Sequence, residues 1–132
     1  MTQPKKTAYF VATALFCAAI APSAVLNVVQ PSFVVDAMEI IGMPMPVIAW
    51  LGVWKMLGIA ALAQPRFRAI NEWAYAGFFF DLTGAAFAHA AASDTVVSMV
   101  TPLVFLLPLG VSYALRPEVE AGAAPVMASS AG

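Results

Sequence analysis

The stretch MPVIAWLGVWKMLGIAALA, residues 45–63, decides what kind of fold this chain can adopt. Lys55 is its one charged residue, and nearly all the other side chains are apolar. A helix that crosses a bilayer needs about 20 predominantly apolar residues. We therefore predict a membrane-spanning helix here, with a charge near its middle.

Three further apolar runs occupy most of the remaining chain, at residues 8–29, 73–92 and 96–115. The chain has 132 residues, of which 62% are hydrophobic and 10% are charged. Soluble domains carry about 25% charged residues, so the composition excludes an ordinary soluble domain. We predict an all-α integral membrane four-helix bundle over residues 8–116. A short N-terminus (1–7) precedes it, and an Ala/Gly/Ser-rich tail (117–132), expected to be disordered, follows it.

A short amphipathic segment lies between the first two runs. Residues 32–41 place their apolar side chains on one face, and Asp36 and Glu39 on the other. Ser32 suits the N-cap position of a helix. The pattern predicts a short interfacial helix between the first two spans. An irregular loop is the alternative.

The N-terminal run imitates a secretory signal peptide, with Lys5 and Lys6 before it and a small-residue pattern at residues 19–21. The run continues to Val29, however, and Pro22 would directly follow the cleavage point. We therefore expect a retained helix that is kinked at Pro22.

The charged residues outside the spans predict the topology. With four spans, all the flanking basic residues fall on one side: Lys5, Lys6, Arg66, Arg68 and Arg116. The opposite loops hold only Asp36, Glu39 and Asp94. Cytoplasmic loops of membrane proteins are enriched in Lys and Arg. We expect a multi-pass protein of the cell membrane with both termini in the cytoplasm.

Lys55 and Asp81 are the two charges at membrane depth. Because the second and third runs are joined by a short loop, their helices should be antiparallel neighbours, and the rise per residue brings both charges to nearly the same level. Each charge shares a helix face with small residues, which allow membrane helices to approach closely. We expect a facing pair, which could be a structural ion pair or a polar site for a proton, a lipid headgroup or a quinone carbonyl.

Three other polar or aromatic residues are candidates for the same site. His89 lies further along the third run and is either a hydrogen-bonded interfacial residue, a proton donor or a haem ligand. Asn27, near the outer end of the first run, could share a polar cluster with His89. Trp54 lies deeper than an interfacial residue should, so it could line the interior or a pocket.

Simpler roles are expected for the remaining residues of interest. Trp73 and Tyr75 suit anchors at the cytoplasmic interface. Glu72 suits the N-terminus of the third helix, where an acid is favourable. The single Cys17 excludes an internal disulfide, and we expect no metal site. No basic patch indicates nucleic-acid binding.

Two stretches resemble motifs of the DoxX-like membrane proteins. They are LGVWKMLG at residues 51–58 and EWAYAGFFFDLTGA at residues 72–85, the latter followed by His89. The resemblance covers residues 8–116 and implies a four-span helical bundle. The founding member of the wider family is the small membrane subunit of a thiosulfate:quinone oxidoreductase, and other members are linked to redox homeostasis.

One departure from the family concerns the first span. Many relatives carry a Ser-Gly pair and a downstream Lys near its end, whereas this chain has Ser23-Ala24-Val25-Leu26-Asn27. Asn27 thus stands where the basic residue is expected.

These observations support several hypotheses about function. The first is a redox-associated membrane subunit that binds quinone or lipid in the bundle, without a tightly held cofactor of its own. The second is a non-catalytic scaffold or accessory subunit of a larger membrane complex or homo-oligomer. A small transporter or proton pathway ranks last, because no inverted repeat is visible.

Overall fold

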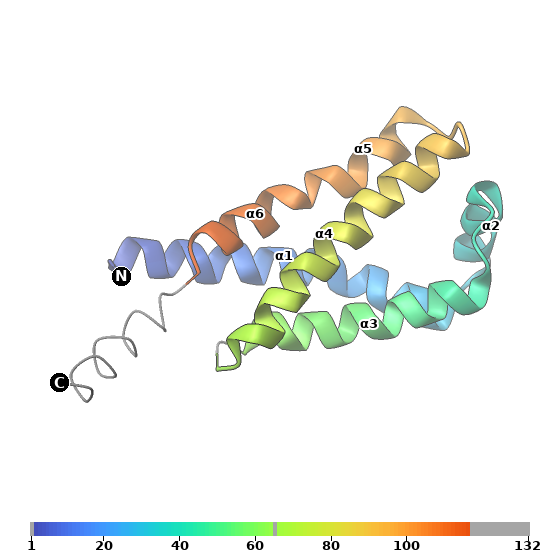
Figure 1. Ribbon diagram of the computed structural model, residues 1–132. Helices are drawn as coiled ribbons and strands as arrows, with labels where there is room; N and C mark the ends of the chain where they lie inside the picture. The colour runs from blue at the N-terminus through green and yellow to red at the C-terminus, as the bar shows by residue number, and fades with distance from the viewer. Residues whose placement is uncertain (1, 65, 117–132) are drawn as a thin grey trace.

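The computed structural model describes residues 2–64 and 66–116, and these residues form an all-α fold (Figure 1). No strand occurs among them. The helices are α1 (Gln3–Val29), α2 (Ser32–Ile41), α3 (Met45–Ala63), α4 (Arg68–Ala91), α5 (Val96–Val104) and α6 (Leu106–Ala114). The expected tail, 117–132, lies outside the described residues.

Helix α1 packs against both α3 and α6. Helix α4 contacts α3 near the loop that joins them, and then diverges from it toward α2 (Figure 1). Helix α5 returns alongside α4. The buried core lies between α1, α3, α4 and α6, and includes Phe16, Ile20, Leu62, Phe78, Leu82 and Leu109.

The predicted spans agree with the helices in position but not in every boundary. Helix α3 has the predicted bounds, and α1 continues through Pro22 without interruption. The predicted fourth span is divided at Phe105 into α5 and α6. Pro102 and Pro108 lie on either side of this point, and each lacks the backbone N–H that a continuous helix requires.

Three helical segments of the described chain are long and apolar enough to cross a membrane: Gln3–Val29, Met45–Ala63 and Val96–Ala114. Helix α4 has 24 residues, which at 1.5 Å per residue is sufficient length. It falls outside this set because polar residues, Asp81 and His89 among them, interrupt its apolar run.

The segment between the first two spans is a helix, not the alternative irregular loop. Helix α2 has the predicted bounds, but Pro31 occupies the N-cap and Ser32 is the first helical residue, so the predicted cap was wrong. Gly42 ends the helix with a φ of 71°, a left-handed conformation that glycine adopts without strain. Phe33 and Ile40 of α2 are exposed.

Two expectations for the start of the third span were wrong. Helix α4 begins at Arg68, so Glu72 lies in the second turn, where it pairs with Arg68 and with Arg116 beyond α6. These guanidinium groups, Arg116 above all, lower the pKa of the Glu72 carboxyl. Tyr75 is buried and hydrogen-bonded to Ser112, so it is a core residue rather than an interfacial anchor. Trp73, by contrast, is 82% exposed.

Candidate functional site

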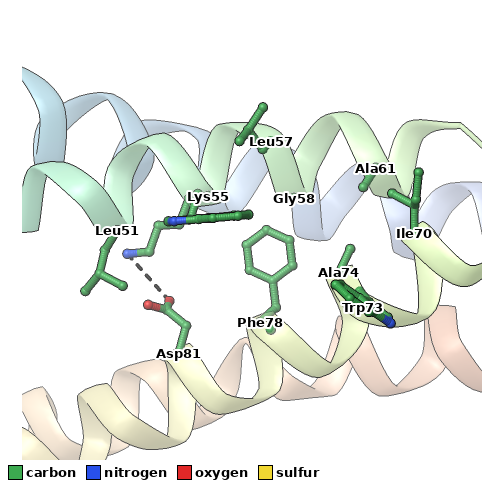
Figure 2. A pocket seen from close by; sticks show the side chains of 12 residues that line it. Leu51, Lys55, Leu57, Gly58, Ala61, Ile70, Trp73, Ala74, Phe78 and Asp81 are labelled. Carbon is green, nitrogen blue, oxygen red and sulfur yellow. Dashed lines mark ion pairs between the residues drawn. The ribbon is translucent and has the colours of Figure 1, made fainter.

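Lys55 and Asp81 face each other across α3 and α4, as their depth and helical phase predicted (Figure 2). Lys55 Nζ lies 3.6 Å from Asp81 Oδ2, and the two side chains are only 13% and 16% exposed. This separation is longer than the 2.7–3.2 Å of a good N–H···O hydrogen bond. The contact is therefore an ion pair without strong directional bonding.

Helix α1 supplies two further partners for the Lys55 ammonium group. Lys55 Nζ donates to Ser23 Oγ at 3.0 Å. With the Asn27 amide in the orientation that satisfies its neighbours, Asn27 Oδ1 accepts from Lys55 Nζ at 3.2 Å, and its amino group donates to the Ser23 carbonyl. Three acceptors on two helices thus surround one largely buried cation.

Gly52 allows α3 to approach α1 closely enough for these contacts. A Cβ atom at Gly52 would lie 2.8 Å from Val28 Cγ2 and 2.9 Å from the Ala24 carbonyl oxygen. Such distances are shorter than any side chain tolerates, so only glycine permits this separation of the two helices. Lys55 follows Gly52 by three residues and therefore lies close to the same contact.

The small residues of α4 do not serve the close packing that the sequence predicted. A Cβ atom at Gly77 or Gly84 would meet no other atom within 4 Å. Both glycines therefore border open space rather than a neighbouring helix. That space forms two cavities, which meet at the Lys55–Asp81 pair.

The larger cavity has a volume of about 450 Å³ and lies between α1, α2, α3, α4 and α5. Its polar lining consists of Ser23, Asn27, Lys55, Asp81, His89 and Thr101. Met38, Ile41 and Met43 cover it from α2 and the turn after α2. It opens to the surface beside Phe80 and Thr101, which are exposed, and we refer to it as the interior cavity. The sequence-predicted residues Lys55, Asp81, Asn27 and His89 all line it.

His89 also lines the interior cavity, eight residues or about 12 Å of helix beyond Asp81 on α4. Its Nδ1 lies 2.7 Å from Asp94 Oδ2, while the backbone N–H of Thr95 donates to Asp94 Oδ1. These two bonds lower the pKa of the Asp94 carboxyl, and the bond from Thr95 has the larger effect. His89 and Asn27 line one cavity but bond to different partners, so the expected polar cluster of these two residues is not formed.

Trp54 lines a second hollow rather than the interior cavity. It is 54% exposed and packs edge-to-face against Trp50, with ring centroids 5.7 Å apart. The hollow is an apolar groove between α3 and α4, and Lys55 and Asp81 also line it. Trp54 was expected to line either the interior or a pocket, and the structure supports the pocket.

Two polar features were not predicted from the sequence. Ser23 lies one helical turn before Asn27, a spacing that could have indicated a shared partner. A buried hydroxyl network also joins three helices: Ser112 Oγ lies 2.6 Å from Thr13 Oγ1 and 2.7 Å from the Tyr75 hydroxyl. This network stabilises the core and does not reach either cavity.

The site lies within a region shared with known proteins. A model of the DoxX-like family matches residues 11–112, which include both helices of the Lys55–Asp81 pair. The chain belongs to the DoxX-like family. Comparisons with curated proteins and with solved structures gave no significant match. Family membership and the three apolar helices of spanning length together identify a small membrane protein.

Proposed function

We propose that this DoxX-like protein is a redox-associated membrane subunit that binds the head of a quinone in the interior cavity, with Lys55 as the hydrogen-bond donor to a quinone carbonyl. One observation carries the proposal: the Lys55 ammonium lines a cavity of about 450 Å³ at mid-span and makes only a long contact with Asp81. An ammonium group has three N–H donors. Ser23 and Asn27 accept from it at good distances, so a third donor is available to a ligand.

The charge balance favours a neutral acceptor over an anionic one. Asp81 compensates the Lys55 charge, so the pair offers little net attraction to a phosphate group. Lys55 is also the eleventh residue of the 19-residue α3, at the middle of the span. Phospholipid headgroups occupy the interface, whereas a neutral carbonyl can enter the apolar interior at lower cost. A quinone head therefore suits the site better than a lipid headgroup.

Each residue has a defined role in holding the head. Lys55 donates to the carbonyl oxygen, and Asp81, Ser23 and Asn27 hold the ammonium in place. A bound quinone would supply electron-accepting chemistry, and His89, which also lines the cavity, can carry a proton on its ring. The redox association itself is proposed from the resemblance given in the sequence analysis, because members of the wider family are linked to redox homeostasis.

The proposal includes four spans, with α4 as the third and α5–α6 as the fourth, in the cell membrane. Asp81 and His89 of α4 both line the interior cavity, and ionisable residues within a membrane usually line such polar sites. The Glu72–Arg116 pair places the start of α4 beside the end of α6. The basic residues then gather at one end of the bundle and α2 lies at the other (Figure 1), which supports cytoplasmic termini.

Cysteine labelling on the two sides of α4 tests this topology. In a Cys17→Ala background, we would introduce Phe67→Cys before α4 and Ser93→Cys after it, both at exposed positions. A membrane-impermeant maleimide should label Ser93→Cys in intact cells, and Phe67→Cys only after permeabilisation. Labelling of both positions from the same side would refute the four-span topology.

Quinone titration of the purified protein tests the site. Quinone binding is followed by quenching of tryptophan fluorescence, because Trp54 lies beside Lys55. Lys55→Met should weaken binding at least tenfold, since a hydrogen bond from a charged donor contributes about 1.5–3 kcal/mol. Lys6→Met makes the same chemical change at an exposed position and should leave affinity unchanged.

The affinity must be expressed per folded molecule, so that a loss of stability is not mistaken for a loss of binding. Equal affinity of the wild type and Lys55→Met would refute the proposed site. Absence of quinone binding, together with a stoichiometric co-purifying protein, would instead favour the scaffold role.

A further inference from the structure

We propose that the apolar groove between α3 and α4 holds the hydrocarbon tail of the quinone whose head occupies the interior cavity, so that the ligand enters sideways from the bilayer. This inference rests on the proposed function and extends it to the tail and the route of entry. It requires that the groove be apolar, open to lipid and continuous with the polar site.

The groove has a volume of about 380 Å³ and an almost wholly apolar lining. Figure 2 shows the Lys55–Asp81 pair at one end, and Ile70 and Trp73 at the other, with Phe78 between them. Trp73 lies eight residues before Asp81, so the groove extends about 12 Å along α4. This shape, with one polar end and a long apolar channel, suits an alkyl or isoprenoid chain attached to a polar head.

The groove and the interior cavity meet at three residues that line both: Leu51, Lys55 and Asp81. A head that accepts a hydrogen bond from Lys55 can therefore leave its tail on the groove side of the ion pair. The long Lys55–Asp81 contact leaves this boundary without a tight hydrogen bond.

Two glycines shape the groove in opposite ways. A Cβ atom at Gly58 would lie 2.7 Å from the Phe78 ring, so Gly58 allows this ring to pack under α3 and form the floor. Gly77 meets no atom within 4 Å, so it leaves the groove open. Along the rim, Leu57, Ile70 and Trp73 are more than half exposed, and in a membrane protein such side chains contact lipid.

A second groove on the same helix provides a matched control. It lies between α4 and α6, has a volume of about 410 Å³ and contains Gly110, which also has open space around it. Neither Lys55 nor Asp81 lines it. A bulky residue at Gly110 therefore fills an apolar groove of similar size without approaching the polar site.

The test compares Gly77→Leu with Gly110→Leu, using a benzoquinone without a tail and the same head with a decyl tail. Both variants should fold, because a Cβ atom fits at each position. Gly77→Leu should weaken binding of the decyl quinone at least tenfold and leave binding of the tail-less quinone unchanged. Gly110→Leu should change neither affinity.

Each other outcome has a defined meaning. If Gly77→Leu binds the decyl quinone as the wild type does, or if the tail adds no affinity to the wild type, the inference about the groove is overturned while the proposed head site stands. If the wild type binds neither quinone, the proposed function fails. If Gly77→Leu only dissociates a dimer, the groove is an interface between copies, and the inference is again overturned.

Discussion

Replacing Lys55 with methionine removes a largely buried cation and leaves the Asp81 carboxylate without its counter-charge. Asp81 has no other polar partner among the described residues, whereas Lys55 also bonds to Ser23 and Asn27. Breaking a buried pair from one side costs about 3–5 kcal/mol, because an uncompensated charge remains. We expect Lys55→Met to lower the free energy of unfolding by about 3 kcal/mol, the low end, since Asp81 can take up a proton.

Substitution of the partner, Asp81, should lower the free energy of unfolding by less. Asp81→Asn leaves the ammonium with two neutral hydrogen-bond acceptors on α1, so we expect a loss of about 1–2 kcal/mol. The double variant should lose less than the sum of the two single losses, with an interaction energy of about 1 kcal/mol or more. The structure thus predicts both a coupling and an asymmetry between the partners.

These free energies are measured by reversible unfolding in mixed micelles. The fraction of dodecyl sulfate is increased, and unfolding is followed by circular dichroism. Lys6→Met is the control and should change stability by no more than about 0.5 kcal/mol, because Lys6 is exposed. Strictly additive losses would show that Lys55 and Asp81 do not interact. A larger loss for Asp81→Asn than for Lys55→Met would refute the role of α1 in holding the ammonium.

Two further predictions concern residues outside the Lys55–Asp81 site. Tyr75→Phe removes the hydrogen bond to Ser112 within the core, so the free energy of unfolding should fall by about 1 kcal/mol. The affinity for quinone should not change. A fall in affinity would show that the hydroxyl network reaches the site. The pKa of the Asp94 carboxyl is lowered in the folded state, so its bonds to Thr95 and His89 stabilise the fold. This stabilisation is fully present above the usual carboxyl pKa of about 3.9. It is lost as the pH falls through the lower pKa of the folded state. An acid titration of stability should therefore show a decline below about pH 4 that is smaller in Asp94→Asn; identical declines would refute this assignment.

The position of the Lys55–Asp81 pair was predictable because it depends on local rules. A short loop makes α3 and α4 antiparallel neighbours, and a fixed rise per residue then sets the level of each charge. The contribution of α1 was not predictable in the same way. It depends on the rotation and height of α1 against α3, which the contact at Gly52 determines, and no short connection fixes that contact.

The errors have physical causes of the same kind. Small residues on α4 indicated close packing, but whether they pack or leave a cavity depends on the angle between α3 and α4. Tyr75 resembled an interfacial anchor because its buried hydroxyl partner, Ser112, lies 37 residues away on α6. The early start of α4 was missed because hydropathy detects the apolar part of a helix and not the polar turn that precedes it.

The infrared carbonyl stretch of a bound quinone, isotopically labelled at one carbonyl, tests the central claim most directly. A hydrogen bond from the Lys55 ammonium weakens the carbonyl bond, so the band should shift to lower frequency in the wild type and in Lys6→Met. Asp81→Asn keeps the donor and should retain a shift, whereas Lys55→Met should return the band to its position in an apolar solvent. A band that is unshifted in the wild type, or equally shifted in Lys55→Met, would contradict the assignment of Lys55 as the donor to the quinone.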